Sequence, residues 1–144
     1  MRRAVPFLLM LCVAAPAAAD IVVDRPIVRP LPRATLAAVV ATGSAPAADV
    51  AETERQTRRA LARRLRAVQR CLAETEPFRD PNRRGARWVE ARLTFERDAR
   101  PRVDQVRSGG VDESARRCVL EAAQGIQIRR APRGTVHVRV RFRL

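Results

Sequence analysis

Few residues of this chain have the types and spacing that catalysis requires. A reactive site needs a nucleophile with a base, paired carboxylates in a cleft, or a metal held by several ligands. The chain has one histidine, His137, which falls on the polar side of an alternating segment. Glu90 and Glu96 have Arg92 between them, so we expect these carboxylates to pair with arginines. The sequence therefore predicts that the protein is not an enzyme and uses no metal or cofactor.

Arginine is the chemical group that the chain supplies in excess. All 29 basic residues are arginine, against 15 acidic residues, and the formal net charge is +14. A guanidinium group binds carboxylates and phosphates through two parallel hydrogen bonds. The last ten residues, TVHVRVRFRL, alternate apolar and polar side chains. Their polar strip could bind an acidic partner, protect a sheet edge from aggregation, or only face solvent; its members are Thr135, His137, Arg139, Arg141 and Arg143.

Residues 1–19 have the three parts of a secretory signal peptide. Arg2 and Arg3 precede an apolar run over residues 4–15, and three alanines before Asp20 form a small-residue cleavage site. The apolar run is too short for a transmembrane helix. We therefore expect cleavage after Ala19, no membrane anchor afterwards, and a periplasmic or secreted protein.

Two cysteines, Cys71 and Cys118, follow the expected cleavage point. In an exported chain such a pair predicts one disulfide bond, and two buried free thiols are the alternative. On the chain-entropy view, closing a loop of this length stabilises the fold by about 4 kcal/mol.

Residues 20–48 contain four prolines, which is typical of an extended, Pro/Ala-rich linker. The apolar stretches 21–23 and 36–40 could instead add a strand or a short turn to the domain. The domain itself is expected over residues 49–144.

Helical periodicity predicts two helices in that domain. The first begins with a side-chain cap at Asp49 and continues to about Glu74. The second has Asp112 as its cap and ends at Gly125. Their apolar sides are expected to contain Leu61, Leu65, Val68 and Leu72 in the first helix, and Ala115, Cys118, Val119 and Ala122 in the second.

Alternating residues predict three strands. Residues 89–96 form one, residues 102–107 form a hairpin with it, and residues 135–144 form the last. The order is α-β-β-α-β. A right-handed crossover places the last strand beside the first, antiparallel to it and at the edge of a three-stranded sheet. Both helices then cover one face, which brings Cys71 near Cys118.

Five segments, in this order, resemble the AgmX/PglI carboxy-terminal domain family, which is similar to the TonB carboxy-terminal domain. They are VQRC at 68–71, VEARLTF at 89–95, ARRC at 115–118, PRG at 132–134 and RFRL at 141–144. The resemblance covers residues 65–144. It implies a TonB-like α+β fold in an envelope protein that binds other proteins, in TonB-like cases by accepting a partner strand along the sheet edge.

We therefore expect a non-catalytic, exported cell-envelope protein that binds a protein partner through its C-terminal edge strand, residues 135–144. The alternative is an arginine-rich domain that binds an anionic envelope polymer or surface, such as lipopolysaccharide or acidic polysaccharide. Nucleic acid is disfavoured, because export removes the usual target and the chain has no tyrosine and few other aromatic side chains for base stacking.

Overall fold

The computed structural model describes residues 31–75, 78 and 85–144. The predicted signal peptide and residues 20–30 of the predicted linker lie outside these ranges. In chain order the elements are β1 (Thr35–Gly43), α1 (Ala47–Ala73), β2 (Trp88–Glu96), β3 (Arg102–Gly109), α3 (Glu113–Gln124) and β4 (Thr135–Arg143).

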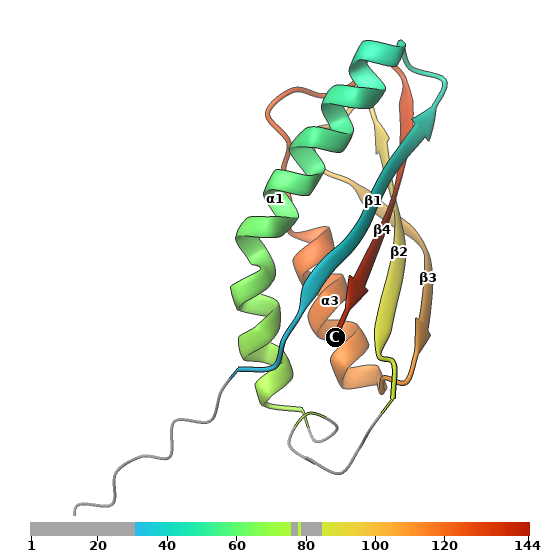
Figure 1. Ribbon diagram of the computed structural model, residues 1–144. Helices are drawn as coiled ribbons and strands as arrows, with labels where there is room; N and C mark the ends of the chain where they lie inside the picture. The colour runs from blue at the N-terminus through green and yellow to red at the C-terminus, as the bar shows by residue number, and fades with distance from the viewer. Residues whose placement is uncertain (1–30, 76–77, 79–84) are drawn as a thin grey trace, which may run out of the picture.

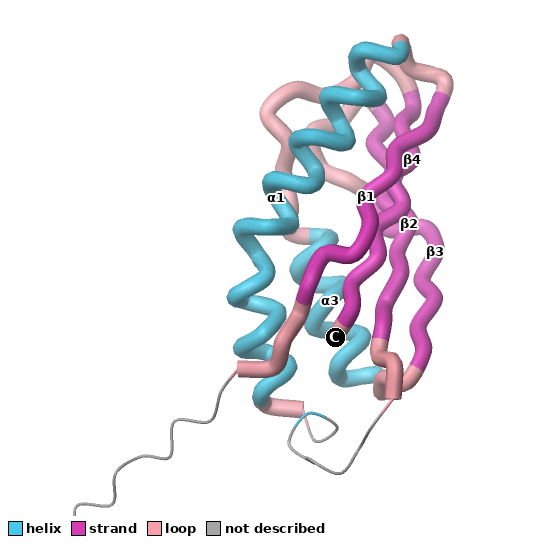
Figure 2. Tube along the Cα trace, viewed as in Figure 1, coloured by secondary structure: helices cyan, strands magenta, loops and turns pink. Residues whose placement is uncertain are grey.

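The strands form one antiparallel sheet in the order β1-β4-β2-β3, and both helices lie on the same side of it (Figures 1 and 2). The expected α+β class, with two helices on an antiparallel sheet, is confirmed. The expected three-stranded sheet is wrong, because the sheet has four strands. Within the described ranges, no helix is both long enough and apolar enough to cross a bilayer.

Strand β4 lies inside the sheet and not at its edge, which corrects the prediction for residues 135–144. Val140 pairs with Ala91 of β2 on one side and with Val39 of β1 on the other. The extra strand β1 comes from the segment TLAAVVATG, so residues 35–43 of the predicted linker belong to the domain. In this segment the structure contains the added strand that the sequence allowed as the alternative to a linker.

The first helix also begins earlier than predicted, and Asp49 is not its cap. Helix α1 starts after Pro46, which makes no side-chain cap hydrogen bond. Asp49 instead accepts hydrogen bonds from the backbone N–H of Arg133 at 3.1 Å and from its Nε at 2.8 Å. The start of α1 is thereby tied to the turn that precedes β4. In α3 the predicted cap is confirmed, because Asp112 accepts from the Ala115 N–H at 2.8 Å.

The core lies between the sheet and the two helices. The predicted inward residues of β2 and β4 are at most 1% exposed, as are Leu61, Val68 and Leu72 of α1 and Val119 of α3. Burying each large apolar side chain is worth about 1.5–3 kcal/mol. This covered face of the sheet consists of Val89, Ala91, Leu93 and Phe95 of β2 and Val136, Val138, Val140 and Phe142 of β4.

A disulfide joins the two helices. Cys71 of α1 and Cys118 of α3 are bonded, with their Cα atoms 5.7 Å apart. The predicted bond is confirmed, as is the packing of both helices on one face that was expected to bring these residues together.

Candidate functional site

The side of the sheet away from the helices is uncovered and rich in arginine. Because side chains alternate along a strand, the residues between the buried positions of β2 and β4 point to this side. Five exposed arginines share it with the half-buried His137. We call this surface the open face, and these five arginines are Arg92 of β2, Arg107 of β3, and Arg139, Arg141 and Arg143 of β4. Arg102 of β3, the register partner of Thr94, lies at its end.

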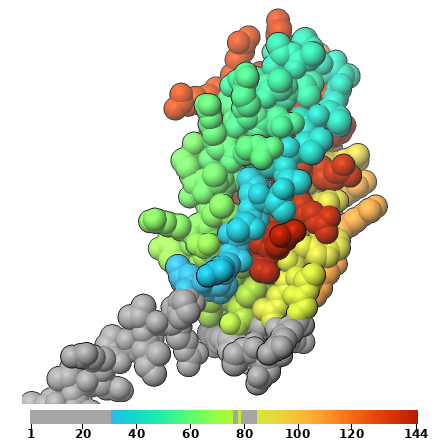
Figure 3. Space-filling model, in the orientation of Figure 1, coloured from blue at the N-terminus to red at the C-terminus, as the bar shows by residue number. Residues whose placement is uncertain are grey.

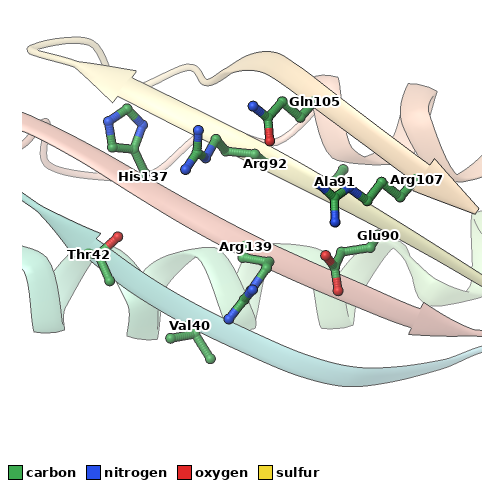
Figure 4. A pocket seen from close by; sticks show the side chains of 9 residues that line it. All are labelled: Val40, Thr42, Glu90, Ala91, Arg92, Gln105, Arg107, His137 and Arg139. Carbon is green, nitrogen blue, oxygen red and sulfur yellow. The ribbon is translucent and has the colours of Figure 1, made fainter.

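A groove of about 360 Å³ crosses the middle of the open face (Figure 4). All four strands contribute to it. His137 lies near one end and Glu90 near the other, with Arg92 and Arg139 between them. The lining residues are Val40, Thr42, Glu90, Ala91, Arg92, Gln105, Arg107, His137 and Arg139.

Two arginines of the groove lie directly opposite each other. Arg92 of β2 and Arg139 of β4 are register partners on adjacent strands. Like charges in such positions destabilise a sheet. Within residues 31–75, 78 and 85–144, no carboxylate oxygen lies within 4.0 Å of a guanidinium nitrogen of the five open-face arginines. Their positive charge is therefore available to a ligand.

Arg102, at one end of the sheet, differs from these five arginines because it pairs with carboxylates. Arg102 of β3 donates from Nε to Asp104 at 2.9 Å and from a terminal nitrogen to Glu96 at 3.3 Å. Glu90, which was also expected to pair with an arginine, forms no ion pair among the described residues. The acidic groups therefore neutralise the end of the sheet and leave its middle basic.

His137 is held by a short chain of hydrogen bonds. The Thr94 hydroxyl donates to Asp104, and Thr94 Oγ1 lies 2.8 Å from His137 Nδ1. The Thr94 hydrogen bond, followed by that of Arg102, holds the pKa of Asp104 below its ordinary value, although burial opposes this shift. Thr94 is only 2% exposed, so the base of this chain lies inside the sheet.

Trp88 marks the other end of the open face. The Arg141 guanidinium carbon lies 4.6 Å from the centre of the Trp88 ring, within the range of a cation–π contact. Trp88 is the register partner of Gly109 on β3. A Cβ at Gly109 would lie 2.5 Å from Trp88 Nε1, so glycine leaves the space that the indole occupies.

The two edges of the sheet differ. Along β1, the Ala41 N–H donates to Glu54 at 3.0 Å, and Arg58 donates to the Val39 carbonyl at 3.0 Å. Figure 3 shows α1 lying beside β1 on this flank. Among the described residues, no element hydrogen-bonds to the backbone of the outer edge of β3.

The predicted partner-binding residues lie together, but in the interior of the sheet. Thr135, His137 and the three arginines of β4 occupy consecutive open-face positions of that strand. Their backbone is already paired on both sides, so they can meet a partner only through side chains. Sequence reasoning missed the rest of the groove, which comes from β1, β2 and β3. The polar alternation of WVEARLTFE was the available signal for Arg92 and Thr94.

In the described part of the chain, no cluster of three or more His, Cys, Asp or Glu side chains is arranged to hold a metal ion. No family model, curated protein or solved structure matches this chain. The resemblance to the AgmX/PglI and TonB-like domains therefore stays a prediction from the five quoted segments.

Proposed function

We propose that this chain is a non-catalytic, exported cell-envelope protein whose open face binds an anionic partner. The observation that carries the proposal is the set of five arginines on a helix-free face with no carboxylate within 4.0 Å in the described residues. The opposed pair of Arg92 and Arg139 costs stability in the free protein, and an anion placed between them removes that cost. An acidic polysaccharide or an anionic lipid surface fits this charge.

Retention on dextran sulfate beads tests the proposal with two variants of equal charge. The first is Arg92→Gln with Arg139→Gln on the open face. The second is Arg59→Gln with Arg66→Gln, which removes two exposed charges from α1. We expect the open-face variant to elute at clearly lower salt than both the wild type and the helix variant, because contacts between exposed charges are screened by salt. Equal elution of the two variants would mean that only net charge matters, and the open face would not be the binding surface.

A protein partner that supplies a strand is the second candidate, and one observation favours a place for it. The outer edge of β3 has no backbone partner among the described residues, whereas side chains of α1 hydrogen-bond to the edge of β1. A partner strand added to β3 would slow amide exchange along residues 102–109 and leave β1 unchanged. Slower exchange confined to β1 would reject this assignment.

A further inference from the structure

We propose that the outer edge of β3 pairs with an extended protein segment in which apolar residues alternate with Asp or Glu. This inference rests on the second candidate function, a partner that supplies a strand, and it names the chemistry of that partner and its place on β3. Three features carry it: the regular backbone in one half of β3, the different side chains on the two sides of this edge, and the positive charge of the strand.

The half of β3 that follows Asp104 has the regular backbone that a partner strand needs. Gln105 and Val103 pair with consecutive residues of β2, so Asp104 between them is the extra residue of a β-bulge. After the bulge, residues 105–109 pair with β2 without a break. No other element hydrogen-bonds to their outer edge in the described part of the chain. Since a bulge disrupts pairing, we expect the partner strand beside residues 105–109.

On the open-face side, this half of β3 offers an arginine and an indole to a neighbouring strand. Arg107 is exposed and forms no ion pair among the described residues. The Trp88 indole lies over Gly109, where it fills the place that a Cβ would take. A residue directly opposite Arg107 on an added strand would have its Cβ about 4.5–5.5 Å away. A carboxylate there is within reach of the guanidinium group, which binds it through two parallel hydrogen bonds.

The covered side of the same edge is apolar. Val106 of β3 and Leu120 of α3 are half-buried and pack against the core, and α3 packs against both β2 and β3. Cys118 faces α1 through the disulfide, and a step of two residues turns a helix by about 200°, so Leu120 faces away from α1. A strand added to β3 therefore places alternate side chains beside Val106 and Leu120. Apolar residues at these positions would bury the remaining surface of both.

The charge of β3 disfavours a second copy of this chain as the partner. Two β3 strands that pair antiparallel with Val103 opposite Val106 also bring Arg102 opposite Arg107. Like charges in directly opposite positions are destabilising, and each chain has a formal net charge of +14. Charged side chains and bulges are features that protect sheet edges from self-association. An acidic segment has the opposite charge, so the features that repel a second copy attract it.

The test uses amide hydrogen exchange of the disulfide-bonded protein at neutral pH, with a synthetic peptide that alternates Val and Glu. A matched peptide has Gln in place of Glu and keeps the apolar pattern without the charge. We expect the Val/Glu peptide to slow exchange within residues 105–109 and to leave β1 unchanged. The Val/Gln peptide should bind about tenfold more weakly, as for loss of a charged hydrogen-bond partner. Fluorescence of Trp88, the one tryptophan of the chain, is the second readout.

Variants separate the two sides of the edge. Arg107→Gln should weaken binding of the Val/Glu peptide by about tenfold and leave binding of the Val/Gln peptide unchanged, because only the first peptide has a charge to lose. Arg66→Gln removes the same charge from the exposed side of α1 and should affect neither peptide. Leu120→Ala removes apolar surface and should weaken both peptides by a similar factor.

Four results would overturn the proposal. Equal affinity for the two peptides would remove the acidic preference, and equal weakening by Arg66→Gln and Arg107→Gln would reduce it to net charge. Slow exchange within residues 105–109 that grows with protein concentration, without peptide, would make a second copy the partner. A Val/Glu peptide that changes Trp88 fluorescence but protects no amide of β3 would be bound only as an anion. In a protein that dextran sulfate still retains through the open face, this last result rejects strand pairing and leaves the anion-binding function standing.

Discussion

Strand β4 contributes alternate residues to two very different surfaces. Val138 is fully buried against the helices, while its neighbour Arg139 is exposed on the open face opposite Arg92. The covered face is apolar and well packed, and it supplies the free energy that holds the fold together. The open face carries like charges that folding does not need and that cost stability. This difference indicates that the covered face determines the structure and that the open face is free to serve binding.

A negative charge introduced on the covered face is expected to have the largest effect on stability. Val138→Asp places a carboxylate without a partner in the core, which should cost more than about 4 kcal/mol and abolish cooperative folding. Circular dichroism melting would measure it. Arg139→Asp, one residue along, is the control and should keep a cooperative transition. A cooperative melt for Val138→Asp would show that this face is not the core.

The disulfide is the next largest contribution on the covered side. Cys71 and Cys118 are 47 residues apart in the chain, and the double change to alanine should lower the free energy of unfolding by about 4 kcal/mol. Urea denaturation would measure the loss. Adding a reductant should destabilise the wild type but not the double variant. An unchanged wild-type midpoint under reducing conditions would contradict this prediction.

An intermediate effect is expected where α1 covers the edge of β1. Glu54→Ala removes the acceptor of the Ala41 N–H, and the loss should be about 1 kcal/mol. Hydrogen exchange at the Ala41 amide should then become faster. The control is Glu52→Ala on the same helix, because Glu52 bonds only to Arg55 and Gln56 among the described residues. If both variants accelerated exchange at Ala41 equally, the helix as a whole would be responsible and not the Glu54 contact.

A smaller effect on stability is expected at acid pH, from the end of the open face where Arg102 pairs with Asp104. The pKa of Asp104 is lowered in the folded state, chiefly by the Thr94 hydroxyl and then by Arg102. The folded protein therefore binds fewer protons than the unfolded chain near the carboxyl pKa. The stabilisation is fully present above about pH 4, the ordinary pKa, and is lost as the pH falls through the lower folded value.

Urea unfolding of Asp104→Asn over a series of pH values measures this effect. The difference between wild type and variant should shrink as the pH falls below about 4. Asp49→Asn should behave with the same sign, because the hydrogen bonds from Arg133 lower the pKa of Asp49. A difference for Asp104→Asn that stayed constant across this range would show that the carboxylate charge does not contribute.

The core could be predicted from the sequence because its patterns are strong. The alternation of β2 and β4 identifies the covered face of the sheet, and the three-to-four spacing in α1 identifies Leu61, Val68 and Leu72. The cysteine pair follows from the packing of both helices on that face. Strand β1 has no such pattern. Its sequence TLAAVVATG is small and almost uniformly apolar, and it follows several prolines, so alternation could not identify it. Because the predicted sheet did not include β1, β4 was expected at its edge. Residues 135–144 were therefore expected to bind a partner strand through their backbone, although they can meet a partner only through side chains.

Only half of the candidate site could be predicted from the sequence, for a related reason. The open-face residues of β4 follow from one strand alone, but the groove depends on register between strands. Arg92 lies opposite Arg139, and a bulge in the pairing of β2 with β3 accompanies the contact of Asp104 with Thr94. The antiparallel pairing of β2 with β3 and with β4 was predicted and is confirmed, but neither its register nor the bulge has a local signal in the sequence. The hydrogen bonds that link Asp104 to His137 therefore become visible only in the structure.

The smallest predicted effect tests the open face directly. Arg139→Thr removes one member of the opposed pair and should raise the free energy of unfolding by about 0.5 kcal/mol at low salt. The gain should disappear at high salt, because the screening length falls from about 10 Å at 0.1 M to about 3 Å at 1 M. Arg141→Thr is the matched control. Arg141 lies opposite Glu90 and over the Trp88 ring, so its loss should not stabilise the protein. If both changes stabilised the fold equally at low salt, the cost would come from the net charge of the chain and not from the Arg92 and Arg139 pair.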